Sequence, residues 1–486
     1  MNVRAARRWA GLSLWVALAA CDGAANDSAA ADPALTREQL LDPETCRGCH
    51  PQHYREWASS MHAYAARDPV FIAMNRRGQR ETDGALGDFC VDCHAPMAVR
   101  EGATSDGLNL DEVPDHLQGV TCYFCHNTVG VGDHFNNDLA LANDRSMRGS
   151  LIDPPPTRAH GSEYSSHHDR NHRDSSRLCG SCHDIVTPSG VALERTFAEY
   201  QESVFWTSEL GFETCLGCHM DSRPVGVGDP HRQAAPIRHE HLWAGIDVAL
   251  TDFPEREAQR AAIECLLSQS ARISAIEHDG FGGFTVRVET DAGHSLPSGA
   301  AQDRRMWLEL IAYDADGAVI FESGTIDDGE LEEKAVDDPD YDRSLVLFRD
   351  RIFDERGEPA HMFWQAAPSQ QHPLGYRSLL LPAMTEAMTA HSVDAKYQVP
   401  SAADVARITS RLRMRPIGID VLQDLVDSGD LDPALLSELP TFTLHGAAVE
   451  WTPEQRELRS LWPEELQCPQ AYVCLLDPSA RECSDD

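Results

Sequence analysis

The residues of this chain with the clearest chemistry are cysteine pairs, each followed at once by a histidine. The pattern Cys-x-x-Cys-His occurs five times within about 175 residues. The copies are Cys46, Cys49 and His50; Cys90, Cys93 and His94; Cys122, Cys125 and His126; Cys179, Cys182 and His183; and Cys215, Cys218 and His219. Two thiols at this spacing add to the vinyl groups of a haem, and the histidine binds the iron from one face. The pattern therefore predicts five covalently attached haem c groups, with the five histidines as proximal ligands.

A zinc site and a redox-active dithiol are the alternative interpretations of a Cys-x-x-Cys pair. Histidine fills 22 of the 486 positions, so chance would place it after a given pair only about one time in twenty. A zinc site joins two such pairs on one ion and gives no reason for a histidine after each. Haem attachment is therefore the favoured interpretation.

The second axial position of each iron decides what the haem can do. A second histidine saturates the iron and leaves an electron carrier, whereas an open face admits a substrate. Histidine is abundant and only 11 methionines are present, so we expect mostly histidine at these positions. The candidate distal ligands are His62, His160, His168, His239, His241 and His294, with His53, His116 and His134 as weaker candidates.

Two of these candidates are constrained by their surroundings. If residues 51–64 are helical, His62 lies about 18 Å along the axis from His50. It would then cap the iron of a neighbouring haem. His294 lies in Gly293-His-Ser-Leu-Pro-Ser-Gly. It either caps the fifth iron or belongs to a turn whose glycine and proline fix the backbone.

The elements that must position these residues fall into two regions. Residues 38–245 hold every motif and 16 of the 22 histidines, and they show little regular periodicity. We expect a five-haem domain in which the porphyrins act as the core, wrapped by short helices and loops. One helix is predicted from Pro51, because Tyr54, Trp57 and Met61 follow at helical spacing. A second is predicted over 194–205.

The later part of the chain has a different texture. Residues 246–268 are predicted to contain a connecting helix. In 269–455, runs such as Phe284-Thr-Val-Arg-Val-Glu-Thr alternate apolar and polar residues between Gly, Asp and Pro turns, which is typical of an antiparallel sandwich. The predicted fold class is α+β multidomain: an irregular, mostly α multihaem domain, a β-sandwich-like domain, and a cysteine-containing tail over 456–486.

The N-terminus predicts export. Three arginines precede an apolar run from Trp9 to Ala20 that is short for a bilayer span, as in a signal peptide over 1–20. Leu18-Ala-Ala-Cys21 resembles a bacterial lipobox, which predicts lipidation of Cys21 after cleavage; ordinary cleavage with Cys21 incidental is the alternative. Residues 21–37 read as a flexible tether. We expect a membrane-anchored lipoprotein in the periplasm or at the cell surface.

The net charge limits which partners the protein can bind. The formal net charge of −37 argues against nucleic acid and against anionic membrane surfaces. It serves solubility, or it steers basic redox partners.

Beyond the haem motifs and Cys21, four cysteines remain: Cys265, Cys468, Cys474 and Cys483. They allow up to two disulfides, and the closeness of the last three predicts one bridge within the tail.

Several segments resemble a known family. They are Trp57-Ala-Ser-Ser-Met-His62, Cys90-Val-Asp-Cys-His-Ala-Pro, Gly119-Val-Thr-Cys-Tyr-Phe-Cys-His and Leu178-Cys-Gly-Ser-Cys-His-Asp. All resemble segments of exported multihaem cytochromes c, a group that includes the tetrahaem cytochrome c partner of hydroxylamine oxidoreductase. Gly293-His-Ser-Leu-Pro-Ser-Gly with Arg304-Arg-Met-Trp-Leu-Glu resembles a β-domain that accompanies some of them.

The resemblance implies haems in stacked pairs that form an electron wire. It also implies His62, and either His160 or His168, as distal ligands. The chain departs from the family in having five motifs rather than four or eight. It also lacks the Cys-x-x-Cys-Lys variant that some ammonia-forming nitrite reductases use, which disfavours that reaction.

Three functions follow as hypotheses. The leading one is an electron carrier between a membrane or periplasmic donor, basic or membrane-bound, and a terminal acceptor. The alternative is an oxidoreductase that acts on a small nitrogen or sulfur compound at one five-coordinate haem. In the third, the β-domain docks a partner and the haems serve as its electron relay.

Overall fold

The computed structural model describes residues 34–208, 211–224, 237–326, 331, 342–368, 392–400, 402–455, 457–461 and 470–476. The predicted signal peptide, the predicted lipidation site at Cys21 and most of the predicted tether lie outside these residues. The described part shows helices together with several antiparallel sheets. The mixed α+β class is therefore confirmed.

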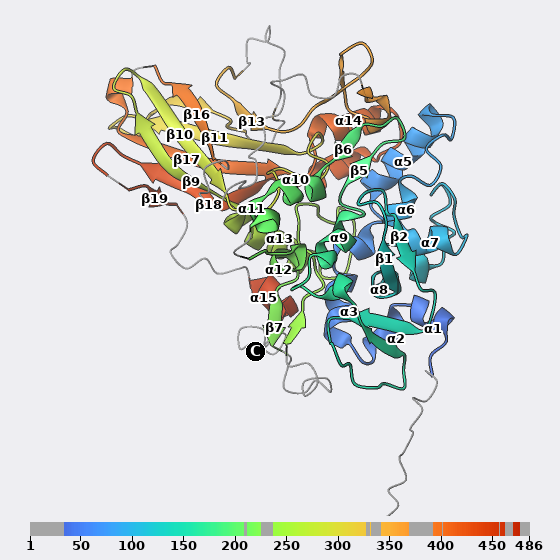
Figure 1. The fold of residues 1–486 in the computed structure, drawn as a ribbon. Coiled ribbons are helices and arrows are strands. Elements are labelled where there is room, and N and C mark those ends of the chain that lie inside the picture. The colour runs from blue at the N-terminus through green and yellow to red at the C-terminus, as the bar shows by residue number, and fades with distance from the viewer. Residues whose placement is uncertain are drawn as a thin grey trace, which may run out of the picture.

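The first half of the chain consists of short helices, as the sequence predicts. Those before residue 130 are α1 (Arg37–Leu41), α2 (Glu44–Arg47), α3 (Pro51–Ala58), α4 (Met61–Tyr64), α5 (Pro69–Glu81), α6 (Val91–His94), α7 (Pro96–Arg100) and α8 (Cys122–His126). The later ones are α9 (Asp174–Gly180), α10 (Thr196–Glu202), α11 (Val204–Thr207) and α12 (Cys215–His219). Figure 1 shows α5, α6 and α7 on the side of the molecule away from the large sheets, and α10 and α11 next to those sheets.

The predicted continuous helix over 51–64 is wrong. Helix α3 begins at Pro51, in the first turn where a missing N–H costs nothing, but it ends at Ala58. Ser60 has an extended backbone, and its hydroxyl accepts from the N–H of Ala63, 3.3 Å away, so it starts the new helix α4. A serine that can cap a helix competes with its continuation. His62 therefore sits on a separate helix from the first motif.

Two other helix predictions need correction. The segment 194–205 begins in a strand and then forms α10 and α11, broken at Ser203, which is extended. The connecting helix is α13, and it spans Arg256–Ser270, so the first ten residues of 246–268 are not helical. Glu255, the residue just before α13, has a left-handed φ of 55°, so the backbone changes conformation there and α13 begins at the next residue.

Small two-stranded sheets tie the loops of the first half together. They pair β1 (Thr128–Val131) with β2 (Leu139–Leu141), β3 (Ser146–Gly149) with β4 (Gly161–Tyr164), β5 (Ile185–Val186) with β6 (Ala192–Glu194), and β7 (Ser222–Pro224) with β8 (Ile237–His239). Only the β3–β4 pair, among the residues described, is parallel in this region.

Two larger antiparallel sheets form the second half. One has the order β16-β10-β9, from β9 (Ala271–His278), β10 (Gly283–Thr290) and β16 (Ser392–Gln398). The other has the order β12-β11-β17-β18-β19, with β13 also on β11. Its strands are β11 (Arg305–Tyr313), β12 (Val319–Ser323), β13 (Val346–Phe348), β17 (Arg407–Arg415), β18 (Phe442–Trp451) and β19 (Arg459–Ser460). Strands β14 (Ile352–Phe353) and β15 (Pro359–Ala360) pair separately.

The alternating residues of the strands explain how these sheets pack. In β10, Phe284, Val286 and Val288 point to one side and are at most 1% exposed. They share one apolar cluster with Leu308 of β11 and Leu412 of β17, because side chains two apart lie on one face of a strand. An Asp279-Gly-Phe-Gly turn connects β9 to β10, and the Asp279 carboxylate accepts two backbone N–H groups there.

Elements from the second half also pack against the haem-motif half. Helix α14 (Ile419–Asp427) puts Val421, Leu422 and Leu425 into a cluster with Ala73 of α5. Helix α15 (Gln470–Leu476) packs on α13 and lies near α3 in Figure 1. Cys265 on α13 and Cys474 on α15 are both disulfide-bonded. The other two cysteines outside the motifs and Cys21, Cys468 and Cys483, lie outside the described residues.

No helix in the described ranges is both long and apolar enough to cross a membrane.

Candidate haem sites

The motif residues share one local geometry, a single helical turn. In the first, second and fourth motifs the histidine N–H donates to the carbonyl of the first cysteine, at 2.8, 3.3 and 3.1 Å for His50, His94 and His183. Such a turn places residues three and four apart on one side, so both thiols and the imidazole face the same space. None of the ten motif cysteines, all of which are described, forms a disulfide, so disulfide bonding does not compete with covalent attachment.

Histidines from distant parts of the chain face the motif histidines. A bond from a transition metal to an imidazole nitrogen is about 2 Å, and the ring centre lies about 1.2 Å behind that nitrogen, so two imidazoles on one metal have centres about 6.4 Å apart. Among the described residues, four pairs that join a motif histidine to a histidine distant in the sequence lie near this separation. They are His50 and His160 at 6.4 Å, His62 and His183 at 6.2 Å, His126 and His241 at 6.1 Å, and His219 and His294 at 6.3 Å.

Hydrogen bonds fix which ring nitrogen of these histidines is free. Backbone carbonyls lie against Nδ1 of His126 (2.6 Å), His160 (2.8 Å), His219 (3.0 Å), His241 (2.9 Å) and His294 (2.9 Å). A carbonyl only accepts, so each Nδ1 carries the proton and Nε2 keeps its lone pair. This is the arrangement by which proteins orient metal-binding histidines.

Burial favours the neutral form of the same rings. Desolvation lowers the pKa of His62 to about 3, with the nearby His183 as a further cause. Burial likewise lowers the pKa of His183 and of His219 to about 4. A neutral imidazole is the form that binds a metal. Thiol pairs, free nitrogens and ring separations together fit haem at these positions.

His94 of the second motif is different. Its Nδ1 is 3.2 Å from the carbonyl of Ala65, so it is oriented like the others. However, its ring stacks on Phe71, with centres 4.0 Å apart and planes 3° from parallel. Within the described ranges no histidine ring forms a spaced pair with it. A haem held by this motif would have one axial position without a facing histidine from those ranges.

Two predicted distal ligands lie elsewhere. His168 stacks on His126 at 5.0 Å, which is too close for a shared metal, and its Nε2 lies 2.9 Å from the carbonyl of Cys125. His239 has Nδ1 3.2 Å from the carbonyl of Met220. In the described part of the chain neither forms a spaced pair with a motif histidine.

The weaker candidates are also placed. His53 lies between two pairs, with its ring 5.9 Å from His50 and 4.8 Å from His241. His134 contacts the edge of Phe197. His116 lies on a short 3-10 helix over 115–117.

Thiols of different motifs touch one another. A hydrogen bond to the Cys122 thiol lowers the pKa of Cys46, and hydrogen bonds from Cys93 and Cys179 lower the pKa of Cys182 and Cys215. The first motif thus adjoins the third, the second adjoins the fourth, and the fourth adjoins the fifth. Besides the hydrogen bond between Cys179 and Cys215, the nearby Cys125 of the third motif raises the pKa of Cys179 in the fourth, so these two groups of motifs also lie close to each other.

No sequence pattern indicates the residues that support His241. Glu56 of α3 and Arg238 of β8 form a buried ion pair at 2.7 Å, with side chains 0% and 7% exposed. The second carboxylate oxygen of Glu56 accepts the backbone N–H of His241 at 3.0 Å. These partners are 182 residues apart, so only the fold brings them together. Trp243, two residues after a candidate ligand, contacts both His241 and His62.

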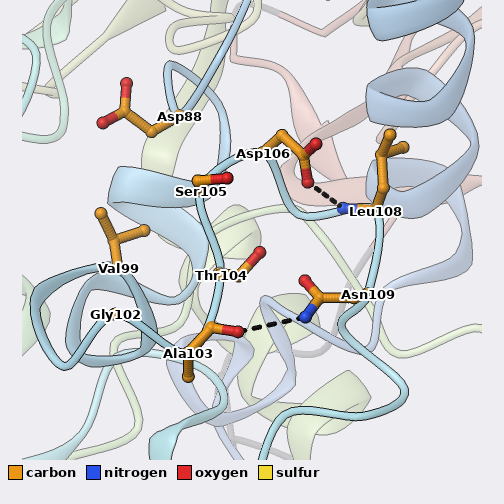
Figure 2. Close-up of a pocket in the computed structure, with 9 residues that line it drawn as sticks. All are labelled: Asp88, Val99, Gly102, Ala103, Thr104, Ser105, Asp106, Leu108 and Asn109. Atoms are coloured by element: carbon orange, nitrogen blue, oxygen red, sulfur yellow. Dashed lines mark hydrogen bonds between the residues drawn. The ribbon is translucent and has the colours of Figure 1, made fainter.

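A surface pocket of about 690 Å³ lies in the loop that follows α7. Figure 2 shows its lining, in which Asn109 donates to the carbonyl of Ala103 and the backbone of Leu108 to Asp106. The lining residues are Asp88, Val99, Gly102, Ala103, Thr104, Ser105, Asp106, Leu108 and Asn109. No predicted site residue lines this pocket.

Two comparisons with known proteins bear on this arrangement. Residues 45–127 match the family model described as cytochrome c554 and c-prime. The crystal structure of a penta-heme cytochrome c552 from Thermochromatium tepidum is similar in fold, with a TM-score of 0.56 and 23% identity over 85% of this chain and 98% of that chain. No curated protein matches. These two findings support the predicted resemblance to multihaem cytochromes c. They do not confirm the specific resemblance to the partner of hydroxylamine oxidoreductase.

Proposed function

We propose that this chain, a multihaem c-type cytochrome, is an exported electron carrier with five covalently attached haems. The four histidine pairs carry the proposal, since each is spaced to hold one iron between two imidazoles. An iron with two imidazoles has no position for a substrate, so it exchanges single electrons. The protein supplies spacing, ligation and polarity, while the cofactor supplies the redox chemistry.

The pairs also yield a proposed ligand assignment. The motif histidines are proximal, and the distal ligands are His160, His241, His62 and His294 for the first, third, fourth and fifth haems. This assignment leaves His168 and His239 outside the coordination. The contacts between motifs support a closely packed group in which electrons pass from haem to haem.

Haem counting and spectroscopy test the carrier proposal. Mass spectrometry of the purified holoprotein should give five haems per chain. Electron paramagnetic resonance of the ferric protein should show at least four low-spin haems. A count other than five, or fewer than four low-spin haems, would contradict the proposal.

The ligand assignment has its own test. Replacing His160 with alanine should convert one low-spin haem to high-spin, whereas replacing His168 with alanine should leave the low-spin count unchanged. The reverse result would exchange the roles of these two residues.

A second candidate function is favoured by His94. Phe71 lies against this ring, and no described histidine faces it. The second haem would then have an open position where a small nitrogen or sulfur compound could bind, and the other four haems would deliver or remove electrons. This is the oxidoreductase hypothesis, located at one motif.

Ligand titration separates the carrier from the oxidoreductase. If the second haem is open, about one fifth of the iron is high-spin, and nitrite or hydroxylamine changes that signal and reoxidises or reduces the whole protein. A fully low-spin ferric spectrum that neither compound alters would exclude the oxidoreductase.

Export, anchoring and partners belong to the same proposal. A lipid on Cys21 would hold the carrier at a membrane, and the net charge of −37 would attract a basic donor. The β-region, proposed to be sandwich-like, would dock a partner. Replacing Cys21 with alanine should release the protein into the soluble periplasmic fraction with its haem spectrum intact. Release of the unaltered protein would contradict lipidation.

A further inference from the structure

One short segment contacts the ligands of three histidine pairs. The carbonyl of His239 accepts from Nδ1 of His241, which faces His126, and the carbonyl of Ala244 accepts from Nδ1 of His219. Between them, the indole of Trp243 lies against two imidazoles. Residues 239–244, called here the ligand-support segment, therefore touch the surroundings of the third, fourth and fifth motifs.

Trp243 is the member of this segment that contacts distal histidines of two different pairs. Its ring centre is 4.7 Å from that of His62 and 5.1 Å from that of His241, with planes crossed at 73° and 70°. Edge-to-face contacts of this kind are favourable and directional. The two imidazoles face His183 and His126, so one indole supports ligands of the fourth and third motifs together.

The backbone at Trp243 is in a conformation that bulky residues rarely adopt. Its φ is +48°, in the left-handed region where a side chain meets the following carbonyl. Glycine is the usual residue at such a position, and strained positions of this kind gather at functional sites. A tryptophan at this strained position suggests that contacts of its side chain offset the cost of the backbone conformation.

Contacts on both sides hold the segment in place. The N–H of His241 donates to Glu56, and the N–H of Glu240 donates to the carbonyl of Asp221. Leu242 is 2% exposed and packs in a cluster formed by α13 and α15. The indole thus projects from an anchored backbone toward His62 and His241.

We propose that Trp243 is a positioning residue that sets the orientation of the distal imidazoles of two neighbouring haems. The inference rests on the proposed function, because it needs haem iron between these histidine pairs. The orientation and contacts of an axial ligand tune the electronic state and reduction potential of the iron. One side chain would therefore adjust the potentials of the third and fourth haems together.

The test compares substitutions at Trp243 with one at Trp206. Trp206 contacts Phe197, Tyr200 and Arg173 in the same half of the protein. In the part of the chain that the structure describes it contacts none of the paired histidines, so Trp206→Leu is the matched control. Trp243→Gly removes the ring and relieves the backbone. Trp243→Leu fills the space without an aromatic edge, and Trp243→Phe restores the edge contacts.

The readouts are the low-spin resonance signals and a potentiometric titration of each holoprotein. In Trp243→Gly and Trp243→Leu, the signals of two haems should move, and the ratio of oxidised to reduced form at a fixed potential should change about tenfold, which is about 59 mV for a one-electron couple. Trp243→Phe should return both haems toward the unaltered values, and Trp206→Leu should leave all haems unchanged.

The two proposals fail differently. If the unaltered protein lacks four low-spin haems, the carrier proposal fails. If it has them, and Trp243→Gly and Trp243→Leu leave every signal and potential unchanged, the role of Trp243 fails alone. A variant in which all five haems move equally also overturns the inference, since it would mark general structural damage. If Trp243→Gly does not fold, the comparison of Trp243→Leu with Trp243→Phe decides.

Discussion

Replacing Glu56 with alanine should both destabilise the protein and release one distal ligand. The change leaves the guanidinium of Arg238 buried without its carboxylate, since the two side chains are 0% and 7% exposed. Breaking a buried pair in this way costs about 3–5 kcal/mol. We expect the lower end, because Arg238 keeps a hydrogen bond to the carbonyl of Leu476 at 2.9 Å. The N–H of His241 also loses its acceptor.

The more conservative change separates charge from hydrogen bonding. In Glu56→Gln the amide oxygen still accepts from His241, so the ligand should stay in place while the charge is lost. Burial raises the pKa of Glu56 above its ordinary range. The site therefore tolerates a neutral side chain better than an exposed position would. We therefore expect a smaller loss of about 1–3 kcal/mol and an unchanged low-spin count.

The assay is guanidinium unfolding of the holoprotein, followed by circular dichroism and haem absorption, together with resonance spectra of the folded variants. Asp394→Ala is the control, because it breaks an exposed pair with Arg287 in the β-region and exposed pairs contribute little. The reasoning is refuted if Glu56→Ala unfolds at the same guanidinium concentration as the unaltered protein and keeps every low-spin haem.

Three further predictions concern other residues. Burial raises the pKa of Asp68 from 3.8 to about 7; the folded state then favours the acid form, so the unfolding midpoint should fall as the pH rises from about 4 to 7, and Asp68→Asn should flatten that dependence. His294→Ala should open one position opposite His219, seen as one new high-spin haem that added imidazole returns to low-spin; no new high-spin signal would remove His294 from the assignment. Gly119→Ala should cost at least about 1 kcal/mol and disturb the haem of His62, because Gly119 has φ +72° and an added Cβ would lie 2.6 Å from the His62 carbonyl; unchanged stability in a denaturant titration would contradict this.

The sequence predicted those features of the protein that depend on residues close to one another along the chain. The haem motifs are readable because one helical turn brings two thiols and an imidazole together within five positions. The mixed α+β class was predictable because alternation such as that of Phe284, Val286 and Val288 follows from strand geometry. The same reasoning failed at Ser60, whose hydroxyl caps a new helix where apolar spacing predicted a continuous one.

Most pairings across the chain could not be predicted. The sequence left His160 and His168 as equal candidates. The structure distinguishes them, because the ring of His160 lies 6.4 Å from that of His50, whereas Nε2 of His168 is hydrogen-bonded to a backbone carbonyl. The structure also brings His294, which lies between β10 and β11, to His219, and this agrees with one of the two roles that the sequence left open for His294.

The sequence by itself determined how many haem-attachment motifs the chain carries and which histidine follows each pair of thiols, because these residues are adjacent along the chain. Only the tertiary structure decided the far side. The histidines proposed as distal ligands come from other elements than the motifs that they face, so their positions depend on the packing of α4, β8 and the loop of His294, and on contacts such as Glu56 with His241. The difference between four facing histidines and the Phe71 that covers His94 is a property of the fold.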